Sequence, residues 1–202
     1  HTAYRRQRQM CIRDRDIIMI SLPRLTLIGP ESTGKTTLAI ALAEHYHTSW
    51  APEYLREFCQ RKWEKTGIVC EWDDLIPILQ GSLHNEQEAA IRARGLVILD
   101  TNPITLEIYS KLYYRKVPAA IKKASAKRPE NEFYILTNTD VPWEFDVLRD
   151  RENERDYILD LMKSELIQRK LPYLLVSGPV EERLKQINRW LKSQLSIHAS
   201  VP

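Results

Sequence analysis

The sequence has few cysteines, no excess of charge of one sign and no long hydrophobic run, and each scarcity excludes a class of protein. Its 202 residues include 3 cysteines, Cys11, Cys59 and Cys70. Their spacing matches neither a zinc site nor a disulfide framework, so we expect reduced thiols in a cytoplasmic protein. No apolar run approaches the roughly 18 residues that a membrane span needs, so we expect no membrane partner.

The charge balance argues against a nucleic-acid partner. Lys and Arg total 30 and Asp and Glu total 27, a net charge of +3, whereas nucleic-acid-binding domains carry a clear basic excess. The hydrophobic fraction of 43% and the charged fraction of 28% are typical of a chain that folds around a packed core. The length suits one domain and leaves the oligomeric state open.

The start of the chain differs from the rest. Residues 1–16 are rich in arginine and have neither a regular hydrophobic period nor the apolar region of a signal peptide. We interpret residues 1–20 as a disordered or non-native leader, with a basic arm that binds nucleic acid as the alternative. The predicted domain is then residues 21–202.

A phosphate-binding loop is the strongest motif in the chain. Residues 29–36 read GPESTGKT, which matches G-x-x-x-x-G-K-T, with an apolar strand before it and a helix-like run after it. We expect Lys35 to reach the β- and γ-phosphates of ATP and the Thr36 hydroxyl to coordinate Mg²⁺. The alternative is a chance turn before a helix. The residues predicted to bind the ATP phosphates here are Gly29, Glu31, Ser32, Thr33, Gly34, Lys35, Thr36 and Thr37.

Strand and helix patterns alternate after residue 23, which predicts α/β architecture with a parallel sheet. Ligands of such sheets bind at the carboxyl ends of the strands, so the residues that follow each strand are candidates for chemistry. The predicted strands are residues 24–28, 48–50, 96–99, 133–136 and 173–176. The predicted helices are residues 37–46, 55–65, 74–92, 104–114, 152–170 and 180–195.

Acidic residues follow two of these strands. Asp100 comes after four apolar residues, the Walker B pattern, and we expect it to hold Mg²⁺. Thr101 and Asn102 follow it, and we expect them to face the cleft and contact substrate. Glu53 follows the second extended segment and is predicted to accept the proton of an acceptor hydroxyl. The alternative for Glu53 is an acid that stabilises the dipole of a helix N-terminus.

Two further segments predict substrate and phosphate contacts. Tyr54 and Arg56 follow Glu53, and Arg56 is a candidate for binding the acceptor; a surface ion pair is its alternative. The segment after residues 133–136 carries Trp143, Arg149 and Arg151, which predicts an arginine-bearing lid that closes over the phosphates. A charged, solvated helix start is the alternative for this segment. We assign phosphate contacts to both arginines and substrate contact to Trp143.

The motifs GPESTGKTTL, APEYLREF, LDTN and DVPWEFDVLRD, in this order, resemble the NadR-type ribosylnicotinamide kinase family over about residues 22–195. The resemblance implies a P-loop NTPase three-layer sandwich, with a five-stranded parallel sheet in the order 2-3-1-4-5, helices on both faces and a small lid. It implies phosphorylation of the 5′-hydroxyl of nicotinamide riboside by ATP with Mg²⁺, in NAD salvage. The implied catalytic residues are Lys35, Glu53, Asp100 and Arg149.

The chain departs from that family in three places. Pro52 stands where bifunctional relatives have Trp, Ser82 follows Gly81 where Gln is common, and Val147 stands where Gly is usual. No H-x-G-H adenylyltransferase signature occurs, so the resemblance implies a kinase alone. The alternatives are a P-loop kinase for another nucleoside or small alcohol, or an ATP-binding regulatory module. A GTPase is not expected, because no N-K-x-D signature is present.

Overall fold

The computed structural model describes residues 22–198, so the leader predicted for residues 1–20 and the two ends of the predicted domain lie outside the described residues. The elements, in chain order, are β1 (Arg24–Ile28), α2 (Lys35–His45), β2 (Trp50–Ala51), α3 (Tyr54–Thr66), η1 (Trp72–Asp74), α4 (Leu75–Arg92), β3 (Val97–Asp100), α5 (Pro103–Tyr114), α6 (Ala119–Ala126), β4 (Glu132–Thr137), η2 (Glu152–Glu154), α7 (Arg155–Gln168), β5 (Tyr173–Val176) and α8 (Val180–His198).

The sheet has the predicted topology. Its five strands are parallel and lie in the order β2-β3-β1-β4-β5. β1 is central, and Leu27 lies opposite Asp100 of β3 and Ile135 of β4. All residues of β3 and β4 are buried, as expected for strands covered on both faces. The predicted α/β fold class and strand order are confirmed.

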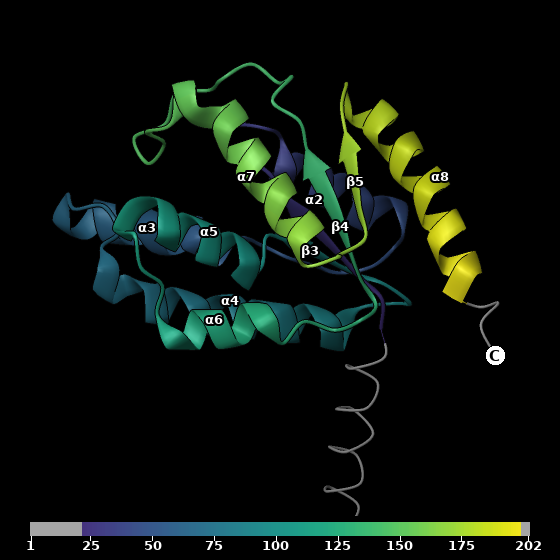
Figure 1. Cartoon of the computed structure of the whole chain (residues 1–202), viewed down its shortest axis with the longest axis horizontal. Helices are drawn as coiled ribbons and strands as arrows, with labels where there is room; N and C mark the ends of the chain where they lie inside the picture. The colour runs from purple at the N-terminus through teal and green to yellow at the C-terminus, as the bar shows by residue number, and fades with distance from the viewer. Residues whose placement is uncertain (1–21, 199–202) are drawn as a thin grey trace, which may run out of the picture.

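Helices cover both faces of this sheet (Figure 1). Leu25, Leu27 and Phe133 pack with α2 and α8 on one face. Residues one position along the strands, Ile28 and Tyr134, face the other way and pack with α5 and α7, because successive side chains of a strand point to opposite faces. α4 covers β2 and β3 on this second face, and α3 and α6 pack on the outer side of α4 and α5.

The start of one helix was predicted wrongly and one helix was missed. α7 begins at Arg155 after the short turn η2, three residues later than expected. α4 has Asp74 at its N-cap position, in agreement with the helix predicted over residues 74–92, and the Asp74 side chain accepts a hydrogen bond from the Glu71 N–H in the capping box that starts η1. α6 was not predicted, because only Ile121 and Ser125 of its eight residues are buried and the apolar period is short.

The thiol prediction was wrong for two of the three cysteines. Cys59 in α3 and Cys70 form a disulfide, with their Cα atoms 5.5 Å apart. α3 ends at Gly67, whose φ of 67° is the left-handed conformation that turns the chain back. That turn brings residue 70 beside residue 59, a contact that cysteine spacing alone does not reveal. Cys11 lies outside the described residues.

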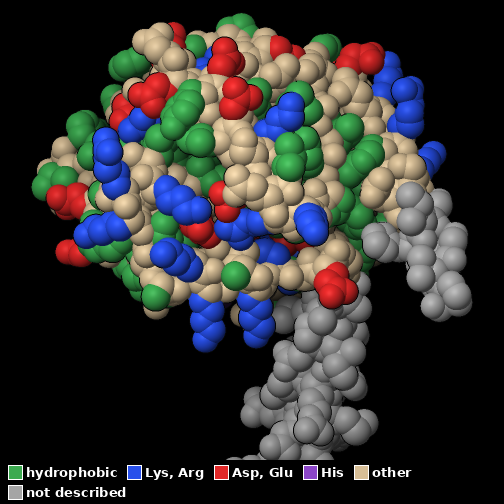
Figure 2. Space-filling view, viewed as in Figure 1, with side chains coloured by type: hydrophobic (Ala, Val, Ile, Leu, Met, Phe, Trp, Pro, Cys, Tyr) green, Lys and Arg blue, Asp and Glu red, His purple; other side chains and the backbone are tan. Residues whose placement is uncertain are grey.

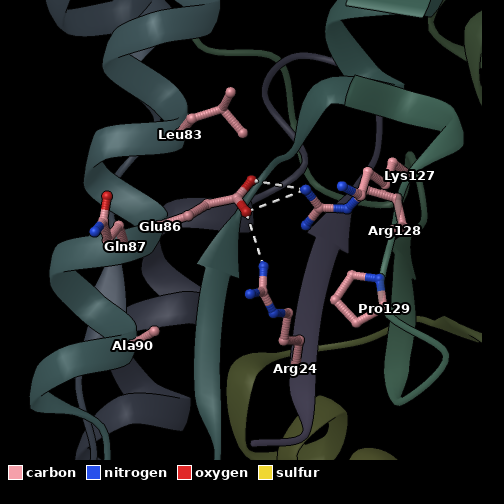
Figure 3. A pocket seen from close by; sticks show the side chains of 8 residues that line it. All are labelled: Arg24, Leu83, Glu86, Gln87, Ala90, Lys127, Arg128 and Pro129. Atoms are coloured by element: carbon pink, nitrogen blue, oxygen red, sulfur yellow. Dashed lines mark hydrogen bonds and ion pairs between the residues drawn. The ribbon is translucent and has the colours of Figure 1, made fainter. Parts of the chain in front are cut away.

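A buried ionic network joins the amino ends of the strands (Figure 3). The Glu86 carboxylate of α4 forms two ion pairs. Its Oε2 lies 3.0 Å from Arg24 Nη1 and 3.1 Å from Arg128 Nη1. Arg128 also pairs with Glu132 at 2.8 Å. The two carboxylates and two guanidiniums balance, which offsets the desolvation that isolated buried charges would suffer. Glu132 also accepts a hydrogen bond from Asn102 at 3.0 Å, so the network reaches the second residue after β3.

Lys and Arg side chains gather on the lower half of the visible surface, where Figure 1 places α4 and α6 (Figure 2). Lys122, Lys123 and Lys127 are exposed there. This basic surface lies at the amino ends of the strands, so it is separate from the phosphate-binding loop at their carboxyl ends. No helix within residues 22–198 combines the length and apolar content needed to cross a membrane.

We expect the disulfide to stabilise the fold. Constraining a loop of this length in the unfolded chain is worth about 3 kcal/mol, which corresponds to roughly 10 °C in melting temperature for a domain of this size. Reductant should therefore lower the melting temperature of the wild type. The double variant Cys59→Ser/Cys70→Ser should melt at the lower temperature with or without reductant. An unchanged melting temperature of the wild type in the presence of reductant would contradict the disulfide between Cys59 and Cys70.

Candidate active site

The phosphate-binding loop is held in its predicted place between β1 and α2. Gly29 passes so close to β4 that a Cβ there would lie 2.1 Å from Thr137 Oγ1, which no side chain could satisfy. Gly34 has φ of 77°, a conformation that glycine adopts without strain. Thr33 Oγ1 donates to Pro30 O at 2.8 Å and lies 2.7 Å from Thr137 Oγ1. The loop is therefore fixed to the end of β4 before any ligand arrives.

The lysine, hydroxyl and acid of the two nucleotide motifs meet at the start of α2. Lys35 Nζ donates to Pro30 O at 2.7 Å, across the loop, and Thr36 Oγ1 donates to Asp100 Oδ2 at 2.6 Å. Thr37 follows in the exposed first turn of α2. Burial raises the pKa of Asp100, while Lys35 and the Thr36 hydrogen bond lower it.

Asp100 and Thr36 fit a magnesium ion. Asp100 is 2% exposed, and its Oδ1 has no hydrogen-bond partner among the described residues. A buried carboxylate oxygen without a partner is costly unless a ligand binds it. Within residues 22–198 no three His, Cys, Asp or Glu side chains gather as a metal cluster, which suits Mg²⁺ because this ion takes one or two protein oxygens and completes its shell with phosphate and water.

Glu53 lies at the same end of the sheet, as predicted. It occupies the N-cap position of α3 but makes no side-chain capping hydrogen bond, which weakens the alternative of a purely helix-stabilising acid. Burial and the nearby Asp100 carboxylate raise the pKa of Glu53 to about 7, against the lowering effects of Lys35 and Arg56. A carboxylate that gains and loses its proton near neutral pH is suited to general-base catalysis.

Three predicted substrate residues make structural contacts within the protein. The Tyr54 ring packs against Gly81 of α4, where a Cβ would lie 2.1 Å from the ring. Asn102 Oδ1 caps α5 by accepting from the Ile104 N–H at 2.9 Å, and its amide donates to Glu132. The Trp143 ring lies under the Arg155 guanidinium, 5.9 Å from ring centroid to Cζ. These side chains therefore have packing and capping roles, and their substrate contacts stay predictions.

Thr101 keeps its expected position. It has an unusual φ of 74°, and it lines a small hollow together with Glu53 and Ser82 of α4. Thr105 lines the same hollow, and its buried Oγ1 has no hydrogen-bond partner among residues 22–198. The hollow therefore places Thr101 beside the predicted general base, and its contact with substrate stays a prediction.

The segment between β4 and α7 carries the predicted lid. Arg56 of α3 pairs with Asp146 of this segment, whereas the sequence suggested the acceptor or a surface pair within α3. Arg149 Nη1 donates to Glu144 O at 2.9 Å. The Arg151 guanidinium lies 4.3 Å over the Tyr113 ring. The Arg151 backbone also makes a hydrogen bond to the Glu31 carboxylate of the phosphate-binding loop. The predicted phosphate contacts of both lid arginines stay predictions.

Glu31 belongs to a group of acids and tyrosines that the sequence did not reveal. One oxygen of Glu31 is buried without a hydrogen-bond partner among the described residues. Burial raises its pKa, and the Asp150 charge raises it further. Tyr113 donates to Asp150 at 2.6 Å and stacks on Tyr109, with ring centroids 6.1 Å apart. Desolvation raises the pKa of the half-buried Tyr109, and the nearby Glu31 and Glu53 charges raise it further, so this group adjoins the general-base candidate.

The only sequence signal for the tyrosines was their spacing, since positions four apart share one face of a helix. Thr137 and Arg183 gave no signal. Thr137 was predicted only as part of a polar loop, yet it lies against Gly29 and Thr33. Arg183 lies in the first turn of α8 and binds the loop at Thr33, 150 residues earlier in the chain.

Residues 24–183 match the AAA_28 family, described as an AAA domain. The chain belongs to this family. It is also similar to the trifunctional NAD biosynthesis/regulator protein NadR of Escherichia coli, 24% identical over 150 residues, which cover 71% of this chain and 36% of NadR. The chain thus spans about a third of the length of that relative. The resemblance inferred from the motifs is confirmed.

Solved structures show the same fold. A NadR structure in complex with NR is 23% identical, with a TM-score of 0.66 over 81% of this chain and 48% of that chain. A NadR structure with NAD and AMP-PNP is 22% identical, with a TM-score of 0.63 over 82% and 46%. The deoxyadenosine kinase of M. mycoides is 14% identical, with a TM-score of 0.59 over 84% of this chain and 99% of that chain.

Asp100→Asn tests the metal assignment. The amide can still accept the Thr36 hydrogen bond, so we expect a folded protein, but a neutral amide is a poor ligand for a hard cation. Turnover measured across a Mg²⁺ series should fall by a factor on the order of 10² or more. Asp160→Asn, at an exposed position of α7, serves as the control. Unchanged turnover and Mg²⁺ dependence in Asp100→Asn would make Asp100 a structural residue.

Proposed function

We propose that this protein transfers the γ-phosphoryl group of ATP to the 5′-hydroxyl of nicotinamide riboside, giving nicotinamide mononucleotide for NAD salvage. The observation that carries the proposal is Glu53, whose carboxylate has a pKa near 7 and lies close to Lys35 and Asp100. The likeness to NadR structures solved with NR and with AMP-PNP supports both substrates. Because the chain spans only part of NadR, the activity is a proposal for this chain.

The residues divide the reaction between them. Backbone N–H groups of the phosphate-binding loop and Lys35 bind the phosphates and hold the γ-phosphorus in place. When bound, Mg²⁺ would supply positive charge to the phosphate oxygens, held by Thr36 and Asp100. Glu53 accepts the hydroxyl proton as the acceptor oxygen bonds to the γ-phosphorus. The bond from that phosphorus to the bridging oxygen breaks, and ADP leaves with the electron pair.

The charge around Glu53 favours a cationic acceptor. Glu31, Glu53 and Asp150 interact electrostatically with one another or with the same tyrosines. Tyr109 and Tyr113 add two stacked rings. The nicotinamide ring of nicotinamide riboside carries a positive charge, which acidic and aromatic groups stabilise. The Arg151 guanidinium already lies over Tyr113, so this surface accepts a planar cation.

An acceptor panel is the direct test. ATP consumption and product mass should show nicotinamide riboside preferred over uridine, thymidine and deoxyadenosine. Deoxyadenosine is included because the likeness to deoxyadenosine kinase covers nearly all of that enzyme. Phosphorylation of ordinary nucleosides without nicotinamide riboside would favour a kinase for another nucleoside. ATP hydrolysis that no acceptor stimulates would favour a regulatory ATP-binding module.

Glu53 also predicts a pH dependence. The base must be ionised, so kcat/KM should fall about tenfold per unit below pH 7 and level off above it. Glu53→Gln should abolish this fall in kcat/KM below pH 7. It should also lower kcat by roughly 10² to 10⁴, with ATP affinity little changed. Glu57→Gln, one turn along α3, is the matched control and should keep the wild-type profile. A Glu53→Gln enzyme with wild-type kcat would exclude Glu53 as the base.

The same pKa shift predicts a stability change. Since the folded protein holds the Glu53 proton more tightly than the unfolded chain, the contribution of Glu53 to stability is present below about pH 4.5 and is lost as pH rises to about 7. Glu53→Gln should therefore raise the free energy of unfolding at pH 8 and change it little at pH 4. Equal effects at both pH values would contradict the buried, shifted carboxyl.

A further inference from the structure

Arg183 is a buried cation bonded to the outer side of the phosphate-binding loop. It is 2% exposed, and its Nη1 donates to Thr33 O at 2.7 Å. Its Nη2 donates to Asp140 Oδ1 at 2.6 Å and its Nε to Gly178 O at 2.8 Å. Asp140 Oδ2 in turn accepts from the Gly178 N–H. One guanidinium therefore joins the loop, the residues after β4 and the turn before α8.

The stability of α8 does not explain this arrangement. Arg183 lies in the first turn of α8, where the helix dipole favours negative charge. A buried guanidinium at this position loses its hydration and is repelled by the helix dipole. Hydrogen bonds to Asp140 and to two carbonyl groups offset these two costs. Any apolar side chain would pack this position without those demands. The placement points to a role for the charge at the loop.

Peptide geometry connects Arg183 to the ligand side of the loop. The described peptide bonds are trans, so the N–H of each peptide points opposite to its C=O. Because Thr33 O points outward to Arg183, the Gly34 N–H points to the concave side, where phosphate binds. Arg155 Nη2 binds the preceding carbonyl, Ser32 O, at 2.9 Å, so the Thr33 N–H is turned inward in the same way.

We propose that Arg183, oriented by Asp140, is a positioning residue for the phosphates of the nucleoside triphosphate. It fixes the Thr33–Gly34 peptide with its N–H directed at phosphate. Its charge also polarises that peptide, because hydrogen bonds in a chain strengthen one another in a low-dielectric environment. The inference rests on phosphate binding in the proposed function and is independent of the acceptor.

Binding titrations with ADP, inorganic tripolyphosphate and adenosine test it. Arg183→Ala should raise the Kd of ADP and of tripolyphosphate about tenfold or more, the effect expected for a charge-assisted hydrogen bond, and leave the KM of the acceptor within about twofold. Arg183→Lys keeps the positive charge but lacks the several N–H donors of the guanidinium, so it should bind both phosphate ligands more tightly than Arg183→Ala and less tightly than the wild type. Asp140→Asn, which keeps an acceptor oxygen, should weaken both phosphate ligands less than Arg183→Ala does.

Arg169→Ala is the matched control. Arg169 also bonds a carbonyl oxygen, of Ser125, and pairs with Glu107 and Glu165, but away from the loop. It should lower the melting temperature and leave the Kd of ADP unchanged. If Arg183→Ala does not fold, Arg183→Lys and Asp140→Asn carry the test.

Two kinds of result would overturn the inference. Wild-type affinity for tripolyphosphate in folded Arg183 variants would overturn it alone, and so would equal weakening of phosphate and acceptor binding, which indicates a general structural role. A wild-type protein that binds neither ADP nor tripolyphosphate would overturn the proposed function itself, and the inference with it.

Discussion

The parallel pairing of β1 with β3 is the constraint on which the site depends. It places Leu27 opposite Asp100, so the chain leaves both strands at one edge. The phosphate-binding loop follows β1 and the acid ends β3, which is why Thr36 reaches Asp100 at 2.6 Å although 64 residues separate them. A slip of one residue in this register would turn Asp100 to the opposite face and separate the acid from the hydroxyl.

Buried charge is distributed differently at the two ends of the sheet. At the amino ends, Glu86 pairs with Arg24 and Arg128 (Figure 3), and Arg128 also pairs with Glu132, so the two carboxylates are balanced by two guanidiniums. At the carboxyl ends, some carboxylate oxygens have no hydrogen-bond partner among residues 22–198, those of Asp100 and Glu31 among them. A surplus of unsatisfied acid destabilises a fold, and such surpluses occur where a ligand completes the site. The difference in unpaired carboxylate oxygens between the two ends of the sheet therefore favours the carboxyl ends of the strands as the place where a ligand binds.

The two ends are nevertheless connected. Asn102 hydrogen-bonds Glu132 of the closed network and also caps α5 through Ile104. α5 carries the stacked pair of tyrosines that adjoins Glu31. The closed network therefore supports the proposed acceptor side indirectly, by fixing the start of the helix that carries these tyrosines. Arg183 has the corresponding part on the phosphate side, where it fixes the loop from behind.

The sequence by itself determined the fold class, the strand order through the family resemblance, and the position of the phosphate-binding loop, because local periodicity and an eight-residue motif are properties of neighbours in the chain. It also identified Glu53 and Asp100, because parallel strands deliver the residues after them to one edge. Tertiary structure decided the rest. The pairing of Cys59 with Cys70, the capping role of Asn102 and the bond of Arg183 to Thr33 depend on which side chains meet across the fold, and spacing along the chain carries no record of those distances.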